Sequence, residues 1–298
     1  SINLISEITM KQLSNNKCIL FFFALFFISG LNAQTSSSYE RDWRTDRQKI
    51  KIISYNIMDG FSNGSDKDRI ARFTAWVKEQ SPDVLALNEL CGFTETKLKE
   101  LAASYGHPYA AIVKENGYPV GLTSKTPIKV VDRKIDGYGH GLLHCKVLNM
   151  DFLVTHLNPH DRLKRKKEAD NIIDYINKNQ LTNCLLMGDM NAHSPFDASW
   201  TDEHLENYAV ISTFMAASLH DICYMFTPDN QRYSYPTRIL TSSPKGEALR
   251  RQQERIDFIF VTDSLRPDCV DAQIYNGPDN DYLSDHYPIG ISMFIPKE

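Results

Sequence analysis

The sequence predicts a mixed α/β fold. Short apolar runs of strand length alternate with longer segments whose apolar residues recur on one helical face. Polar side chains recur at the ends of the apolar runs, where α/β proteins place ligands. The chain has 298 residues, 42% of them hydrophobic and 23% charged, which is typical of a folded globular protein. Because these features continue to about residue 294 without an internal repeat or linker, we expect one domain over residues 48–298.

The first 33 residues have the pattern of a secretory signal peptide. A start at Met10 is followed by a short basic segment, an apolar stretch over residues 18–28, and the small residue Ala33 at the expected cleavage position. The apolar stretch is too short for a stable membrane anchor. Residues 34–47 are polar, and we expect a disordered lead-in there. The domain would then be exported to the periplasm or the extracellular space.

Cleavage after residue 33 would leave five cysteines, an odd number that leaves at least one thiol unpaired. Export permits disulfides, and we expect at most one or two. Cys145 and Cys184 lie in strand-like runs and are interpreted as small buried hydrophobic residues. None of the cysteines has the spacing of a structural zinc site. The five are Cys91, Cys145, Cys184, Cys223 and Cys269.

The first predicted helix follows capping residues 65–68, presents apolar residues at positions 70, 73, 76 and 77, and ends at 81–83. A second helix opens at Thr94 and ends before Gly106. A third is expected to start at Asn158 and Pro159 and to continue through Asn179. Each helix has an apolar stripe and is therefore expected to cover a sheet. The predicted strands are residues 49–54, 84–87, 109–112, 121–124, 128–134, 141–148, 152–154, 184–187, 256–261 and 287–291.

Six of these strands carry polar residues that can share one site. Asp189 and Asn191 follow residues 184–187, and side chains two positions apart on an extended segment point the same way. Such a pair suits a site that binds a cation and a phosphate oxygen, although the same pattern also forms turns. Asp257 lies in an otherwise apolar strand and needs a buried partner. The other strand ends supply Asn56, Glu89, His156, Asp285 and His286.

These motifs, in this order, resemble the endonuclease/exonuclease/phosphatase superfamily of metal-dependent phosphohydrolases. One departure is Asn88, where the family usually has glutamine before the glutamate. The resemblance implies a four-layer α/β/β/α sandwich in which two mixed sheets pack face to face. The matching segments are residues 54–56 (Ser-Tyr-Asn), 87–89 (Leu-Asn-Glu), 121–128, 155–157 (Thr-His-Leu), 188–191 (Gly-Asp-Met-Asn), 255–258 (Arg-Ile-Asp-Phe) and 284–286 (Ser-Asp-His).

The resemblance also implies a metal-binding side of the site. Glu89 is the expected principal ligand, with Asn56 beside it and Asp285 completing that side. A hard divalent cation prefers oxygen ligands and offsets the negative charge of a phosphoester. Because thiolate and multi-histidine ligands are absent from the set, we expect Mg²⁺ or Mn²⁺.

The remaining motif residues are assigned by resemblance to the phosphoester and the water. Asp189 would orient or deprotonate the attacking water, and Asn191 would hold a nonbridging oxygen. His286 would contact the phosphate or shuttle a proton, with Asp257 fixing its ring. His156 would face the scissile phosphate or the leaving oxygen.

Three hypotheses for function remain open. The loss of Glu7, Lys11 and Lys17 with the signal peptide leaves 36 acidic and 31 basic residues, a net charge of −5 that is unusual for a non-specific duplex binder. We therefore favour an exported, monomeric hydrolase of a small or lipid-linked phosphoester. The alternatives are a DNase-like nuclease, which would bind nucleic acid, and a non-catalytic binding module on the same fold.

Two polar segments bear on substrate choice. The basic run at residues 162–167 is interpreted as a solvated helix face, with steering of a polyanion as the alternative. Residues 240–254 are expected to form a long loop before the Asp257 strand. We interpret His140 as lying outside the pocket. The remaining histidines without motif support are expected at the surface or in the core: His107, His160, His193, His204 and His220.

Overall fold

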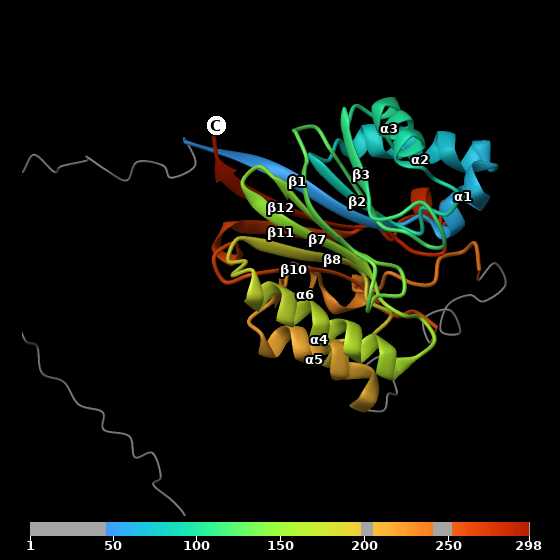
Figure 1. Ribbon diagram of the computed structural model, residues 1–298. Coiled ribbons are helices and arrows are strands. Elements are labelled where there is room, and N and C mark those ends of the chain that lie inside the picture. The colour runs from blue at the N-terminus through green and yellow to red at the C-terminus, as the bar shows by residue number, and fades with distance from the viewer. Residues whose placement is uncertain (1–45, 198–204, 241–251, 298) are drawn as a thin grey trace, which may run out of the picture. The chain divides into compact units, whose positions relative to one another are not determined.

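The computed structural model describes residues 46–197, 205–240 and 252–297 (Figure 1). Two six-stranded sheets pack face to face, and helices cover the outer side of each sheet. The four-layer sandwich is therefore confirmed. The expected signal peptide, nearly all of the polar lead-in, most of the long loop and His204 lie outside the described residues.

The first sheet brings both ends of the domain together in the order β11-β12-β1-β2-β4-β3. Strands β1 and β2 are parallel, and their register sets Asn56 opposite Asn88. The polar residues that end these two strands therefore emerge at one sheet edge. The strands are β1 (Arg47–Asn56), β2 (Val84–Asn88), β3 (Tyr109–Ile112), β4 (Gly121–Ser124), β11 (Cys269–Ile274) and β12 (Ile289–Pro296).

The second sheet has the order β5-β6-β7-β8-β10-β9. Strand β8 is parallel to β7 and antiparallel to β10, so Asp189 lies opposite His156 on one side and Asp257 on the other. Three predicted site residues thus share one row across the sheet. The strands are β5 (Lys129–Lys134), β6 (Leu142–Val147), β7 (Met150–His156), β8 (Cys184–Asp189), β9 (His220–Asp221) and β10 (Asp257–Val261).

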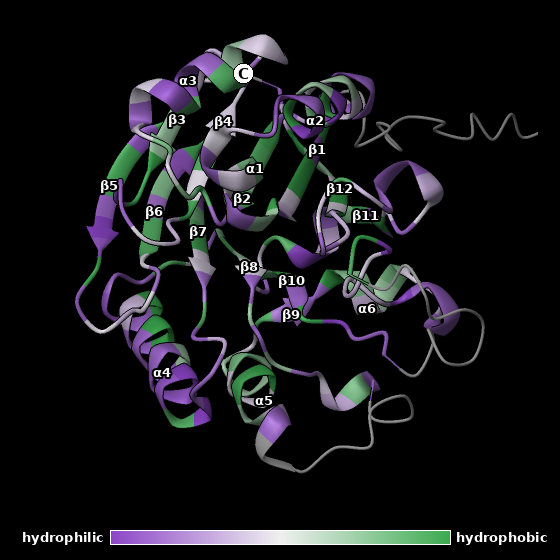
Figure 2. Ribbon diagram, turned by 90° about the vertical axis from the view of Figure 1, so that its right-hand side faces the viewer, coloured by the Kyte–Doolittle hydropathy of each residue, from purple (hydrophilic) through white to green (hydrophobic). Residues whose placement is uncertain are grey.

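The alternation of strand side chains builds three apolar cores. On β1, Ile52 packs into the core between the sheets, whereas Ile53 and Tyr55 pack beneath the helices of the first sheet. A third core lies between the second sheet and its helices. Figure 2 shows the same division, with green strands inside and purple residues along the outer helices.

Two of the three predicted helices begin where their capping residues indicate. Helix α2 (Lys67–Gln80) is capped by Asp66, and α3 (Glu95–Ser104) is capped by Thr94. Helix α4 (Arg162–Lys178) begins after Asp161 rather than at Asn158, so that predicted boundary was wrong. The cause is that Asn158 Oδ1 accepts hydrogen bonds from two backbone N–H groups and closes a turn, while Asp161 caps the helix.

Several elements were not predicted. The segment α1 (Met58–Gly64) has left-handed backbone angles, with φ between 51° and 57° from Asp59 to Asn63. Such a conformation costs about 1–2 kcal/mol per L-residue, so tertiary contacts must hold it. The other elements are strands β9 and β11, helices α5 (Ala209–Ala216) and α6 (Ile222–Phe226), and the short 3₁₀ turns Pro195–Asp197, Leu205–Tyr208, Asp229–Gln231, Arg266–Asp268 and Pro278–Asn280.

The five cysteines after residue 33 are buried free thiols. Cys145 and Cys184 are fully buried in strands, as predicted. Among the described residues, no helix combines the length and apolar character that a membrane crossing requires.

A buried ion cluster holds the segment that leads into β10. Arg255 is 1% exposed, and its guanidinium donates to Asp197 at 2.7 Å and to Asp221 at 2.6 Å. Arg232 also donates to Asp197, at 3.1 Å. Removing one partner of a buried pair leaves a charge uncompensated, which costs about 3–5 kcal/mol. The cluster therefore fixes the backbone immediately before Asp257.

Gly188 has a steric role directly before Asp189. Its φ is +136°, and a Cβ there would lie 1.9 Å from the carbonyl oxygen of Thr155 on β7. We expect Gly188→Ala to lower the free energy of unfolding by about 3 kcal/mol, because strand pairing would have to shift. Gly117→Ala is the matched control, since Gly117 also has positive φ (+67°) but faces open space, and it should lose about 1 kcal/mol. Urea denaturation followed by circular dichroism measures both, and equal losses would contradict this account.

Candidate active site

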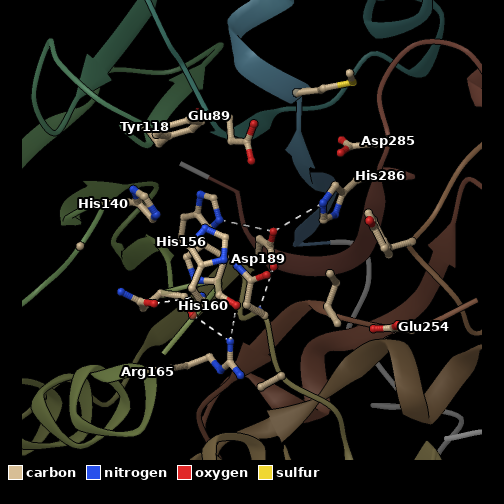
Figure 3. Close-up of a pocket in the computed structure, with 18 of the residues that line it drawn as sticks. Glu89, Tyr118, His140, His156, His160, Arg165, Asp189, Glu254, Asp285 and His286 are labelled. Atoms are coloured by element: carbon tan, nitrogen blue, oxygen red, sulfur yellow. Dashed lines mark hydrogen bonds and ion pairs between the residues drawn. The ribbon is translucent and has the colours of Figure 1, made fainter. Parts of the chain in front are cut away.

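The polar strand ends meet at a pocket of about 890 Å³ (Figure 3). Asn56 and Asp257 are buried and hydrogen-bonded to residues of its wall. All eight predicted site residues are thus brought together, although they come from segments as far apart as β1 and the start of β12. The six that line the pocket are Glu89, His156, Asp189, Asn191, Asp285 and His286.

Glu89 and Asp285 form an acidic side of the pocket. Glu89 accepts hydrogen bonds from the Asp59 backbone N–H at 2.8 Å and from Asn56 Nδ2 at 3.2 Å. Burial raises the pKa of Glu89, and the charge of Asp285 adds to this rise. Glu89 itself has φ of 60°, and the left-handed α1 segment presents the Asp59 N–H to it. This unusual backbone therefore positions the carboxylate.

Asn56 links the acidic side to Asp189. Its amide nitrogen donates to Glu89 and, at 3.1 Å, to Asp189 Oδ2, while its oxygen accepts from the Met58 N–H at 3.1 Å. The amide nitrogen rather than the oxygen therefore faces the carboxylates. The Ser284 hydroxyl donates to the backbone carbonyl of Asn56 at 2.6 Å. This bond ties the start of the Asp285–His286 segment to the end of β1.

Asp189 lies between two histidines. Its Oδ2 atom is 3.6 Å from His286 Nε2 and 3.5 Å from His156 Nε2. His286 Nδ1 is 2.8 Å from Asp257 Oδ2, so the strand carboxylate has the buried partner that the sequence required. The ring of His286 is thus held between two aspartates.

The environments of Asp189 and His286 raise the pKa of both groups. Burial raises the pKa of Asp189 to about 7, although the positive charge of His286 opposes the rise. Burial by itself lowers the pKa of His286, but the charges of Asp257 and Asp189 outweigh it and raise that pKa to about 10. Asp257 therefore pairs with an imidazolium, and Asp189 can exchange a proton near neutral pH.

His156 is a neutral residue stacked on a second histidine. Burial, with the nearby charges of His140 and His286, lowers the pKa of His156 well below its usual value. Its Nδ1 atom is enclosed and has no hydrogen-bond partner among the described residues. The rings of His156 and His140 are 4.4 Å apart and stacked, and burial lowers the pKa of His140 to about 4. Both rings are neutral at pH 7.

His140 lines the pocket, so its predicted place outside was wrong. The loop before β6 turns inward because Glu168 on α4 accepts a hydrogen bond from the Gly139 N–H at 2.7 Å. His160 and His193 also line the pocket rather than lying elsewhere on the surface or in the core. His107 is a satisfied core residue, as predicted, with ring contacts to Thr123 and the Pro82 carbonyl.

Asn191 is fixed by two hydrogen bonds. Its backbone N–H donates to Asp189 Oδ1 at 2.9 Å, and its side-chain nitrogen donates to the Leu157 carbonyl at 3.0 Å. The sequence had left open whether Asp189 and Asn191 form a turn or part of a site. In the structure they do both. Asn191 connects the ends of β7 and β8 and lines the pocket.

The basic run on α4 does not form one solvated face. Lys164 and Lys167 are exposed, and Lys166 pairs with Asp170 at 2.5 Å. Arg165, however, is only 8% exposed and lines the pocket. Arg165 precedes Ala169 by four positions and Ile172 by seven, so the apolar stripe of the helix already indicated that it faces inward. Other lining residues without a sequence signal are Asp59, Tyr118, Tyr235 and Glu254.

The donor chemistry of the pocket fits a divalent cation. Ligand atoms of Asp189, Asp257 and His286 lie within 4.8 Å of one another. Burial raises the pKa of both Glu89 and Asp189, so ionising either carboxyl is costly without a nearby positive charge. Carboxylate oxygens are the ligands that hard cations prefer. The acidic side and the Asp189 group are both suitable positions.

The sequence from residue 53 to residue 286 matches the profile of the Endonuclease/Exonuclease/phosphatase family. No curated protein sequence matches the chain.

The fold is similar to several solved structures. An AP endonuclease from Archaeoglobus fulgidus has a TM-score of 0.65 and 19% identity, covering 84% of this chain and 100% of that chain. The 3′ phosphatase NExo from Neisseria, bound to a product DNA hairpin, has a TM-score of 0.63 and 15% identity, covering 82% and 99%. An endonuclease/exonuclease/phosphatase from Beutenbergia cavernae has a TM-score of 0.58 and 19% identity, covering 84% and 72%. At these identities the likenesses show the fold alone.

The charge state of His286 can be measured directly. Because its pKa is raised to about 10, the ring keeps its proton until the pH rises through that value, and it should be an imidazolium at pH 8. In Asp257→Asn the largest charge that favours the proton is lost, so the pKa should fall by at least about one unit. ¹⁵N chemical shifts of the chelator-treated protein across pH 5–10.5 report both states. A neutral His286 ring at pH 8 in the unmutated protein would contradict this assignment.

Proposed function

Because the chain belongs to the endonuclease/exonuclease/phosphatase family, whose members hydrolyse phosphoester bonds, we propose that it is a divalent-metal-dependent hydrolase of a small or lipid-linked phosphoester. One observation carries the proposal. Asp189 is buried beside His286, with a pKa near 7 for the carboxyl and near 10 for the imidazole. A base and a cationic hydrogen-bond donor therefore lie within reach of one bound phosphate.

Glu89 and Asp285, with Asn56 beside them, would hold the Mg²⁺ or Mn²⁺ ion. When bound, the cation would polarise the phosphoryl oxygens and offset their negative charge. The fit rests on the oxygen-rich acidic side and on the burial that raises the pKa of Glu89.

Asp189 would orient the attacking water and accept its proton. A carboxyl with a pKa near 7 is suited to this exchange at neutral pH. Its Oδ1 atom accepts the Asn191 N–H, and its Oδ2 atom accepts Asn56 Nδ2, so the carboxylate plane is fixed before substrate binds.

His286 would donate a hydrogen bond from Nε2 to a nonbridging phosphoryl oxygen. Asp257 engages Nδ1 and thereby keeps the ring oriented and positively charged. Charge that develops on phosphorus-bound oxygens during in-line attack is stabilised by such a fixed cation. Neutral His156 and Asn191 would contact the phosphate or the leaving oxygen from the opposite wall.

A compact substrate fits the charge distribution. The domain without residues 1–33 is net negative, and the basic run on α4 is divided between exposed, paired and inward-facing side chains. A duplex binder instead requires a continuous set of phosphate contacts. We further propose that residues 1–33 direct export, and that the domain acts in the periplasm or outside the cell as a monomer.

A nuclease is the second candidate. Two proteins of similar fold are an AP endonuclease and a 3′ phosphatase bound to product DNA. A nuclease of this chain would bind DNA with an affinity that falls steeply as salt is added.

The experiment that separates these candidates is a substrate screen. Purified protein starting at residue 34, with Mg²⁺ or Mn²⁺, would be assayed on plasmid DNA, RNA, phospholipids and aryl phosphate mono- and diesters. Turnover of phospholipid or aryl esters above that of DNA supports the proposal. A preference for DNA supports the nuclease, and no turnover of any ester would remove both.

Asp189→Asn should lower kcat by about 10²–10⁴-fold, because the amide cannot accept the water proton. The matched control is Asp151→Asn, since Asp151 is also a buried carboxylate bonded to a histidine, His144 at 2.7 Å, but lies outside the pocket. The control should keep most of its activity. Circular dichroism verifies that both variants are folded, and near-normal turnover by folded Asp189→Asn would exclude Asp189 as the base.

Glu89→Gln should raise the Mg²⁺ or Mn²⁺ concentration needed for half-maximal activity by at least about tenfold. The substitution keeps the side-chain shape and an acceptor for the Asp59 N–H, but removes the charge that attracts the cation. A metal titration of the initial rate measures the change. An unaltered titration curve would argue that the cation lies elsewhere, at Asp189 and His286.

A further inference from the structure

Arg165 is a buried cation on the wall of the pocket that the proposed chemistry does not use. It lies in the first turn of α4 and is 8% exposed. Its neighbours Lys164 and Lys167 point to solvent, whereas Arg165 lines the same pocket as Asp189. A charged side chain is seldom buried without a partner, because removing it from water is costly.

Only one of the three nitrogen groups of the guanidinium donates hydrogen bonds to the described residues. Its Nη1 group donates to the backbone carbonyls of Asn158, at 2.8 Å, and Pro159, at 3.2 Å. Its Nε and Nη2 groups donate to no atom among the described residues, and neither belongs to the fully enclosed polar atoms that lack a partner. These two groups form the parallel fork that binds carboxylates and phosphates through two hydrogen bonds.

The fork is held in a fixed place. Glu168, one turn further along α4, accepts hydrogen bonds from the Asn158 N–H at 2.7 Å and from the Gly139 N–H at 2.7 Å. Glu168 therefore binds the N–H of Asn158 while Arg165 binds its carbonyl, so both side chains hold the same loop residue. The side chain is preorganised, and little conformational entropy would be lost on binding an anion.

Arg165 lies apart from the expected position of the scissile phosphate. Figure 3 shows Glu89 and Asp285 on one side of Asp189 and Arg165 on the other. Asp189 Oδ2 lies within 4 Å of His156 Nε2 and His286 Nε2, whereas among the described residues no ion pair within that distance joins Asp189 to Arg165. The charge of Asp189 acts on the guanidinium from further away and partly offsets the burial that lowers the pKa of Arg165. An anion on the Arg165 fork would lie on the side of Asp189 opposite Glu89 and Asp285, the expected metal ligands.

We propose that Arg165 binds a second oxyanion of the substrate, a phosphate or a carboxylate, and so selects substrates that carry one besides the scissile phosphoester. This inference rests on the proposed hydrolase function. His160 and Asn158 line the same part of the pocket and would surround the group.

Binding to the intact, unmutated protein tests the site without turnover. In the presence of a chelator, calorimetry would compare thymidine 3′,5′-bisphosphate with thymidine 5′-monophosphate, which differ by one phosphate. We expect the bisphosphate to bind at least about tenfold more tightly. A 3′-succinyl derivative of the monophosphate replaces the second phosphate by a carboxylate and distinguishes the two oxyanions. Equal affinity for all three probes, or no binding of any, overturns the proposal.

Variants then assign the preference to Arg165. The readout is the ratio of kcat/KM for p-nitrophenyl esters of thymidine 5′-phosphate with and without a 3′-phosphate, which cancels a general loss of activity. Arg165→Gln should lower this ratio by about tenfold, and Arg165→Lys, which keeps the charge without the fork, should lower it less. Lys167→Gln removes one charge from the same helix and should leave the ratio unchanged. If Arg165→Gln does not fold, Arg165→Lys decides.

An unchanged ratio in the Arg165 variants would show that the residue supports the loop at Asn158 or contacts the scissile phosphate common to both esters, and would overturn the proposal. If the unmutated protein hydrolyses neither ester but binds the bisphosphate selectively, and Arg165→Gln removes that selectivity in calorimetry, the anion site stands. In that case the proposed hydrolase function fails for these esters.

Discussion

The geometry of the pocket depends on one carboxylate, that of Asp189, which side chains from three separate segments contact. Asp189 Oδ2 lies 3.1 Å from Asn56 Nδ2 on the first sheet, 3.5 Å from His156 Nε2 on the second, and 3.6 Å from His286 Nε2 just before the last strand. None of these contacts is local in sequence. The group is therefore assembled only when the two sheets are packed, so the integrity of the core and the geometry of the pocket are one property of the fold.

The sequence was sufficient to predict the strands that carry site residues, although not β9 and β11. Apolar runs of fixed length do not depend on distant partners, and parallel pairs such as β1 with β2, and β7 with β8, bring their carboxyl ends to one edge. All eight residues chosen on that basis lie in or directly behind one pocket. Asp257 was expected to have a buried partner, because a desolvated charge needs a counter-charge nearby. That partner is His286.

Features set by loops and by distant ion pairs could not be predicted. Arg165 was assigned with its basic neighbours to a solvated face, although it precedes Ala169 by four positions and Ile172 by seven and therefore lies on the same buried helical face. The sequence did not show the loop whose Asn158 and Pro159 carbonyls accept hydrogen bonds from the guanidinium. His140 faces the pocket because Glu168, some 29 residues away, binds the preceding loop. The left-handed α1 segment contains residues that tolerate positive φ, namely Asp59, Gly60 and Asn63, but this composition indicates only a turn and does not predict that Phe61 and Ser62 share the conformation.

Asp189 and His286, whose pKa values are both raised, have opposite effects on the stability of the folded state. A carboxyl whose pKa rises from its usual value to about 7 destabilises the folded state above that pH, and this cost disappears as the pH falls below the unfolded value. His286, with its pKa raised to about 10, contributes stability that is complete below its unfolded pKa and is lost as the pH rises through 10. At neutral pH the cost at Asp189 is therefore offset chiefly by the imidazolium beside it. A cation that binds only the folded pocket would add to this compensation and would raise the free energy of unfolding. The buried carboxylates that suit the site to phosphoester chemistry therefore also make the stability of the fold depend on its ligands.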